Sequence, residues 1–153
     1  MDRADRDGMR RATASSREVA GAARSHLNPR SYIVNAKEAL TTLMDLEGII
    51  GACIVDSSSG MMLGSAGGSA TFNLELAAAG NTEVVRAKRK AMKALNLSDP
   101  IEDILITLGR QYHLLRPLRT NGALFIYMAL DRNRANLALA RHQLANAERE
   151  LEV

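Results

Sequence analysis

Hydrophobic residues along this chain follow two patterns, one typical of helices and one typical of buried strands. At three- and four-residue spacing they line one side of three segments, which predicts amphipathic helices over about residues 32–46, 71–95 and 133–153. Short continuous aliphatic runs predict strands elsewhere. The predicted strands are 49–55, 61–63, 101–108, 111–118 and 123–130.

The start of the folded part is marked by Asn28-Pro29, because the residue before a proline is disfavoured in helical conformation. Ser31 is the expected N-cap of the first helix. The inner side of that helix carries Ile33, Ala36, Leu40, Leu43 and Met44. We therefore expect one domain over residues 31–153, preceded by an Arg-rich tail over residues 1–30. The tail holds few large apolar side chains and is expected to be disordered.

Turn residues separate the strands within each group. Residues 56–60 form a Ser-rich turn that ends in glycine, and residues 64–69 are expected to be a loop. Gly109-Arg110 and the Asn-Gly pair within 120–122 are expected to close two further hairpins. Strands joined by such short turns pair antiparallel.

The second and third helices each have an expected cap and inner side. Ser69 or Thr71 is expected to cap the second helix. Its expected inner residues are Leu74, Ala77, Ala78, Val84, Val85, Ala91, Met92 and Leu95. The expected inner residues of the last helix are Leu137, Ala140, Leu144 and Leu151. Arg141, Glu148 and Arg149 are expected to face solvent.

The predicted order of elements is α-β-β-α-β-β-β-α. A five-stranded antiparallel sheet with helices on its faces is the layered arrangement that buries all of these apolar sides. The sequence therefore predicts the α+β class.

This order resembles that of the Roadblock (dynein light chain) family, and the stand-alone bacterial members are the most similar kind. The resemblance covers about residues 31–150 and includes the Ala-rich second helix. It also rests on the turn Val55-Asp56-Ser57-Ser58-Ser59-Gly60 and on the ending Ala129-Leu130-Asp131-Arg132…Ala135-Asn136-Leu137-Ala138-Leu139-Ala140-Arg141. It implies homodimers or heterodimers and partnership with Ras-like small GTPases, as regulator or scaffold.

The positive charge of the chain is concentrated in the tail. Residues 1–30 hold seven arginines and four acidic residues, so the remaining 13 basic and 13 acidic residues leave the body neutral. A second hypothesis is therefore that the tail binds nucleic acid or an anionic surface, although a basic tail is a weaker indication than a basic domain. The sequence shows neither a secretory signal nor a bilayer-spanning apolar run, which predicts a cytoplasmic protein.

No catalytic or cofactor-binding motif is found. The glycine-rich residues 60–68 lack the Lys-Ser/Thr ending of a phosphate-binding loop, which favours a hairpin followed by a loop. His26, His113 and His142 lie far apart, and Cys53 lies in an apolar run, which favours a buried hydrophobe over a nucleophile. We therefore expect a non-catalytic protein without metal or cofactor.

The run 104–108 is the candidate dimer contact. It precedes two hairpin-linked strands, which predicts an edge position, and it contains neither charge nor proline. Soluble proteins protect such edges, and pairing with a second copy would do so. The predicted interface residues are Ile104, Leu105 and Ile106, together with the small residues Ala79 and Gly80 of the second helix.

The densest charge of the body lies on the second helix, over residues 86–93. One interpretation is a solvated helix face. The other is a docking surface for an acidic partner, and its predicted residues are Arg86, Arg89, Lys90 and Lys93.

Overall fold

The computed structural model describes residues 29–151, and the order of its elements is the predicted one. The helices are α1 (Pro29–Leu43), α2 (Leu74–Ala94) and α3 (Leu137–Glu150). The strands are β1 (Ile49–Asp56), β2 (Met61–Gly67), β3 (Ile104–Thr107), β4 (Gln111–Pro117) and β5 (Leu124–Asp131). The predicted α+β class is confirmed.

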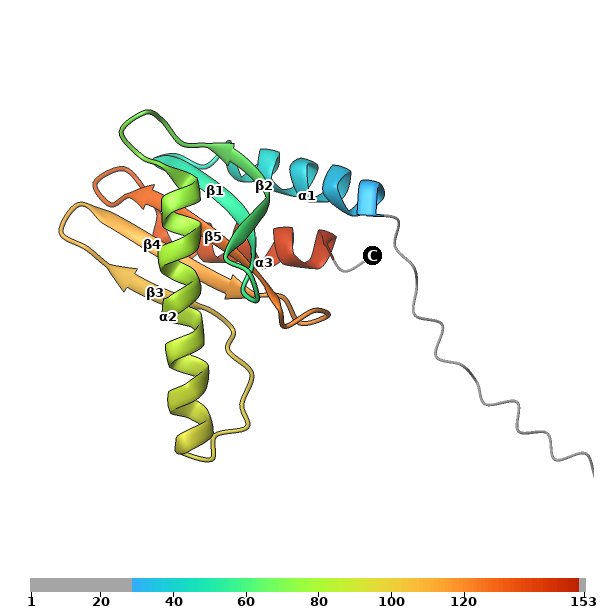
Figure 1. Cartoon of the computed structure of the whole chain (residues 1–153). Coiled ribbons are helices and arrows are strands. Elements are labelled where there is room, and N and C mark those ends of the chain that lie inside the picture. The colour runs from blue at the N-terminus through green and yellow to red at the C-terminus, as the bar shows by residue number, and fades with distance from the viewer. Residues whose placement is uncertain (1–28, 152–153) are drawn as a thin grey trace, which may run out of the picture.

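The five strands form one antiparallel sheet in the order β2-β1-β5-β4-β3. β5 lies in the centre, and β2 and β3 are the two edges. The predicted edge position of β3 is therefore confirmed. Helices α1 and α3 cover one face of the sheet, and α2 crosses the other (Figure 1).

The alternation of side chains along the central strands divides the core between the two faces. Ile126 and Met128 of β5 pack with buried residues of α1 and α3, such as Leu40 and Leu144. Phe125 and Tyr127 point the other way, toward α2. Because both faces of β5 are covered, it reads as an unbroken apolar run.

Ser31 lies inside α1, so the predicted N-cap at this residue is wrong.

Strand β2 continues to Gly67, beyond the predicted end at residue 63, so part of the predicted loop over 64–69 is strand. Gly64 and Gly67 pair with Ile54 and Gly51 of β1. A side chain at Gly51 would lie 2.7 Å from the backbone nitrogen of Gly68, so this close approach of the two strands requires glycine.

Asparagines cap α2 and α3, and the predicted starts of both helices were too early. The side chain of Asn73 accepts a hydrogen bond from the Leu76 N–H at 3.0 Å, in place of a cap at Ser69 or Thr71. Asn136 does the same for Leu139 at 3.1 Å, after a turn rather than helix at residue 133. Asparagine is among the strongest N-caps.

Strand β3 is shorter than the predicted run over 101–108. Ile104 pairs with Leu115, so a continued ladder would bring Glu102 opposite Pro117. Proline has no N–H to donate, which explains why the pairing stops near this point.

Candidate protein-binding surface

The outer edge of β3 is free within the described residues. One side of the strand pairs with β4, and the other makes no strand pairing there. Ile104 and Ile106 are half-buried on the α2 face of the sheet, and Leu105 is 37% exposed on the other. The outer edge of β3 therefore carries both unpaired peptide groups and apolar side chains.

Helix α2 is buried against the sheet only along its first half. Its buried residues run from Leu74 to Val85, where it packs on β1 and β2. Its second half projects beyond the sheet (Figure 1). Ala91 and Leu95 lie on this projecting half and are exposed, because no strand lies beneath them. Val84 is exposed beside the buried Val85, so it lies on the side of α2 that faces away from the sheet. The predicted inner position of these three residues is wrong.

The two small residues predicted at the interface differ in their surroundings. Ala79 lies near the β1–β2 turn, its Cα 3.8 Å from the point where a Cβ of Gly60 would stand. A Cβ on Gly80 would meet nothing within 4 Å, so this face of α2 is open. The dimer interface itself stays a prediction.

A polar cluster lies on the α2 face next to β3. His113 of β4 pairs in register with Ile106, and its Nδ1 lies 3.1 Å from the Tyr127 hydroxyl. Its Nε2 lies 2.8 Å from Gln111 Oε1, so the ring donates to Gln111 and accepts from Tyr127 in its neutral form. The rings of His113 and Phe72 are nearly perpendicular, with 6.0 Å between their centroids. Burial lowers the pKa of His113, which favours this neutral form.

Two of the four predicted docking residues brace the fold. Arg86 donates to the Ser58 carbonyl oxygen at 2.8 Å and pairs with Glu83. Arg89 donates to the Gly122 carbonyl oxygen and to Ser57 Oγ. These contacts hold α2 to the turns at one end of the sheet.

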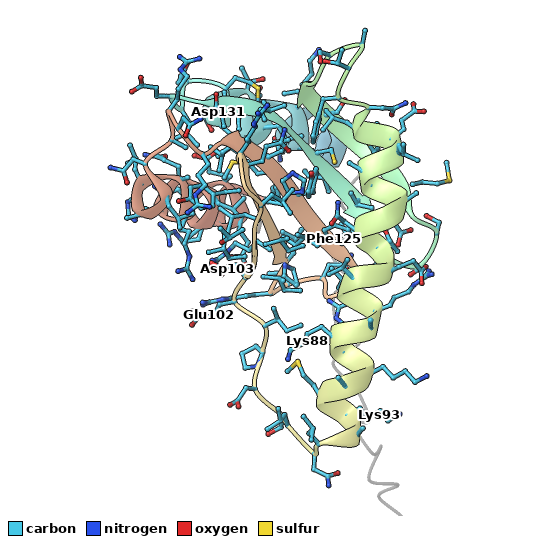
Figure 2. The ribbon with its side chains drawn as sticks, turned by 90° about the vertical axis from the view of Figure 1, so that its left-hand side faces the viewer. Lys88, Lys93, Glu102, Asp103, Phe125 and Asp131 are labelled. Carbon is cyan, nitrogen blue, oxygen red and sulfur yellow. The ribbon has the colours of Figure 1, made fainter. Side chains whose placement is uncertain are left out.

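The other two predicted docking residues have no such contacts. Lys90 and Lys93 are exposed on the projecting half of α2, and Figure 2 shows Lys93 near its end. Among the described residues, neither forms an ion pair. They are therefore the members of the group that are available to a partner.

A buried ion pair connects α3 to β4, and sequence reasoning missed it. Glu148 is 1% exposed, and its Oε2 lies 2.5 Å from Arg116 Nε. Its other oxygen accepts a hydrogen bond from the Arg119 N–H at 3.1 Å. The predicted outward orientation of Glu148 is wrong. The signal was its spacing, since it stands four residues after the inner residue Leu144 and three before Leu151.

This ion pair continues toward the segment before β3. Asp103 receives two hydrogen bonds from Arg141, at 3.0 and 2.9 Å, and its Oδ2 lies 4.0 Å from Arg116 Nη1. Arg141 is half-exposed, as predicted for its side of α3. These contacts hold Asp103, the residue before β3, against α3 and β4.

The structure gives no support to nucleophilic or metal chemistry in the part that it describes. Burial raises the pKa of the Cys53 thiol to about 12, so the thiol stays protonated at neutral pH and is a poor nucleophile. Burial also raises the pKa of Tyr127. Over residues 29–151, no cluster of three or more His, Cys, Asp or Glu side chains could hold a metal ion.

No helix in the described part of the chain is long and apolar enough to cross a membrane. The predictions for the Arg-rich tail and His26 fall outside the described residues, apart from Pro29 and Arg30 in α1.

Comparison with solved structures gives the class of this fold. MglB of Myxococcus xanthus matches with a TM-score of 0.65 at 14% identity, over 82% of this chain and 87% of that one. A Roadblock/LC7 domain from Streptomyces avermitilis matches with a TM-score of 0.66 at 10% identity, over 76% and 93%. An MglB structure described as having a tetrameric arrangement matches at 0.64 and 16% identity, over 81% and 88%.

These likenesses, together with the order and pairing of the strands, assign the chain to the Roadblock/LC7 fold. Within that class, the chain is similar to MglB. No protein-family model matches the sequence, and no curated protein sequence matches it.

Proposed function

We propose that this chain is a non-catalytic, homodimeric binding module that regulates or scaffolds a Ras-like small GTPase. The observation that carries the proposal is the combination of the Roadblock/LC7 fold with the free edge strand β3. The fold supplies the class of protein, and the open edge supplies a reason for self-association.

The dimer contact that we propose pairs β3 with its copy across a two-fold axis. Ile104, Leu105 and Ile106 would then form part of a continuous sheet, and Gly80 on the open side of α2 would lie against the second copy. Ala79 would lie at the periphery of this interface. Free strand edges with no charge or proline are normally paired or covered, and a stable dimer buries more than about 1,000 Å² in total. An MglB structure with a tetrameric arrangement supports self-association in a protein of this fold.

The proposed GTPase partner rests on the family resemblance and on charge. In the neutral body, the basic group on α2 is the densest charge of one sign. We propose that an acidic surface of the partner contacts Lys90 and Lys93, with Arg86 and Arg89 contributing their charge from their braced positions. Charges at an interface rim mainly affect association rate and selectivity.

The proposal is tested by affinity capture from lysate of the native cells, with the full chain as bait and either GTP or GDP added. The expected result is enrichment of a protein with the phosphate-binding loop of a small GTPase, dependent on which nucleotide is present. A Lys90→Glu/Lys93→Glu bait should lose most of it. If no such GTPase is enriched over the variant bait with either nucleotide, the proposal is wrong.

The alternative function is binding of nucleic acid or an anionic surface through the tail. Its dependence on salt and on truncation distinguishes it from the GTPase complex. Nucleic-acid binding by the arginines of residues 1–30 should fall steeply with added salt and should disappear in a chain that begins at Pro29. The proposed GTPase complex should survive that truncation.

A further inference from the structure

A cavity of about 430 Å³ lies beneath the projecting half of α2. Three segments surround it, namely the end of α2, residues 97–101 and the connection from β4 to β5. Figure 2 shows the segment that leads to Glu102 and Asp103 beside this half of the helix. The apolar part of the lining consists of Met92, Leu97, Pro100, Ile101, Pro117 and Leu118. We call this cavity the α2 trough.

The trough opens where β3 and β4 separate. Continued pairing would bring Ile101 opposite Leu118, but both residues instead line the cavity. Within the described part of the chain, the peptide groups of residues 98–103 make no backbone hydrogen bonds to one another or to other segments. Residues 99–101 of this segment line the trough, so part of its wall is backbone outside any helix or strand, with free hydrogen-bonding groups.

The rim of the trough is basic. Arg89, Lys93 and Arg119 line it, against the single carboxylate of Asp99. The Arg119 side chain is 67% exposed, and its Nε reaches Glu148 only at 4.0 Å. Glu148 is already paired with Arg116 at 2.5 Å, so the guanidinium group of Arg119 can contact a ligand.

We propose that the α2 trough binds an acidic, amphipathic peptide segment of a partner protein in extended conformation. A large apolar side chain of the segment would fill the trough, and flanking carboxylates would contact Lys93 and Arg119. The free carbonyl groups of residues 99–101 and the N–H groups of Asp99 and Ile101 would bond to the backbone of the segment, as in other cases where a peptide adds along an exposed strand. The inference goes beyond the proposed function, because it requires neither the dimer nor a GTPase.

The lining favours a peptide over the other anionic ligands. It contains no aromatic side chain, so the bases of single-stranded nucleic acid would have no stacking surface there. Its apolar floor gives a free phosphate nothing to contact. A peptide with alternating acidic and apolar residues matches both the floor and the rim.

The test uses the full chain and a short fluorescein-labelled peptide with two central leucines flanked by glutamates, followed by fluorescence anisotropy. Replacing the glutamates by glutamines, or the leucines by serines, should abolish binding. A Lys93→Glu/Arg119→Glu protein should bind the acidic peptide about tenfold more weakly or worse, a change of roughly 1.4 kcal/mol or more. Leu97→Ser should weaken it to a smaller extent.

The matched control is Lys37→Glu/Arg110→Glu, which changes the net charge equally at exposed positions outside the trough and outside the basic group of α2. It should bind like the wild type, and circular dichroism should show all variants folded. Equal binding by the trough and control variants would overturn the inference. So would tight binding of decanoate in the absence of peptide binding, because the ligand would then be a lipid. Because Lys93 belongs to both proposed surfaces, Leu97→Ser separates the two proposals: it should weaken peptide binding and leave capture of the GTPase unchanged.

Discussion

Strands β5 and β3 belong to the same sheet and both consist mainly of apolar residues, but β5 is buried and β3 is partly exposed. β5 lies between β1 and β4, and every residue from Leu124 to Leu130 is buried. β3 pairs on one side only, and its residues alternate between half-buried and exposed. The difference shows that position in the sheet decides whether an apolar strand holds the monomer together or is available to a partner.

The largest expected effect contrasts the two strands directly. Phe125→Ala should lower the free energy of unfolding by about 3–5 kcal/mol, because it leaves a cavity in the core beneath α2. Leu105→Ala in β3 should cost about 1 kcal/mol or less, since its side chain is already partly exposed. Urea denaturation measures both, in an Ile106→Lys background that removes any contribution from the dimer. Similar losses in the two variants would contradict the comparison.

The next largest loss of stability is expected in the ion pair of β4, the strand that lies between β5 and β3. Glu148→Ala should lower the free energy of unfolding by about 3 kcal/mol, because it leaves the buried Arg116 without its closest partner. Glu150→Ala is the matched control, exposed on the same helix, and should change stability little. Chemical denaturation at neutral pH distinguishes them, and equal effects would show that the ion pair contributes nothing.

A smaller effect is expected from pH. Burial lowers the pKa of His113 in the folded state, so the unfolded chain binds this proton more readily. The contribution of His113 to stability is therefore complete above its ordinary pKa of 6.5 and is lost as pH falls below that value toward the folded-state pKa. Unfolding curves on both sides of pH 6.5 should show a steeper loss for the wild type than for His113→Gln. Parallel losses would mean that other groups cause the pH dependence.

The smallest expected change in stability distinguishes the α2 arginines that bond to turns from the α2 lysines that do not. Arg86→Glu/Arg89→Glu should lower the free energy of unfolding by about 1 kcal/mol, because both arginines donate hydrogen bonds to turns. Lys90→Glu/Lys93→Glu changes the net charge equally and should leave stability nearly unchanged. Thermal unfolding of the two variants provides the measurement, and identical midpoints would remove the distinction.

Much of the fold could be predicted from hydrophobic patterning, because each helix and strand has an apolar side that must be buried. The ends of elements were harder to predict. Ser69 and Thr71 are good caps locally, yet Asn73 caps α2, and Asn136 caps α3 in place of a start near Asn133. Several polar residues near each start satisfy the same local rule, and tertiary packing selects among them.

The candidate site was predicted less completely, because charge on a helix does not reveal its partners. Glu148 and Arg86 both read as solvent-facing, but one pairs with Arg116 beneath α3 and the other braces a turn. The partners lie on segments far away in the sequence. The α2 trough likewise depends on segments far apart in the sequence: Pro117 accounts for the end of the β3–β4 pairing, but not for the position of α2 over the gap.

The central claim is that β3 is the contact through which this chain pairs with a second copy. Light scattering on the purified wild type at micromolar concentration should give about twice the chain mass of 16.6 kDa. Ile106→Lys should shift the mass toward that of one chain, while Met61→Lys on the opposite edge strand should leave the dimer intact. A wild-type mass of 16.6 kDa would contradict the account.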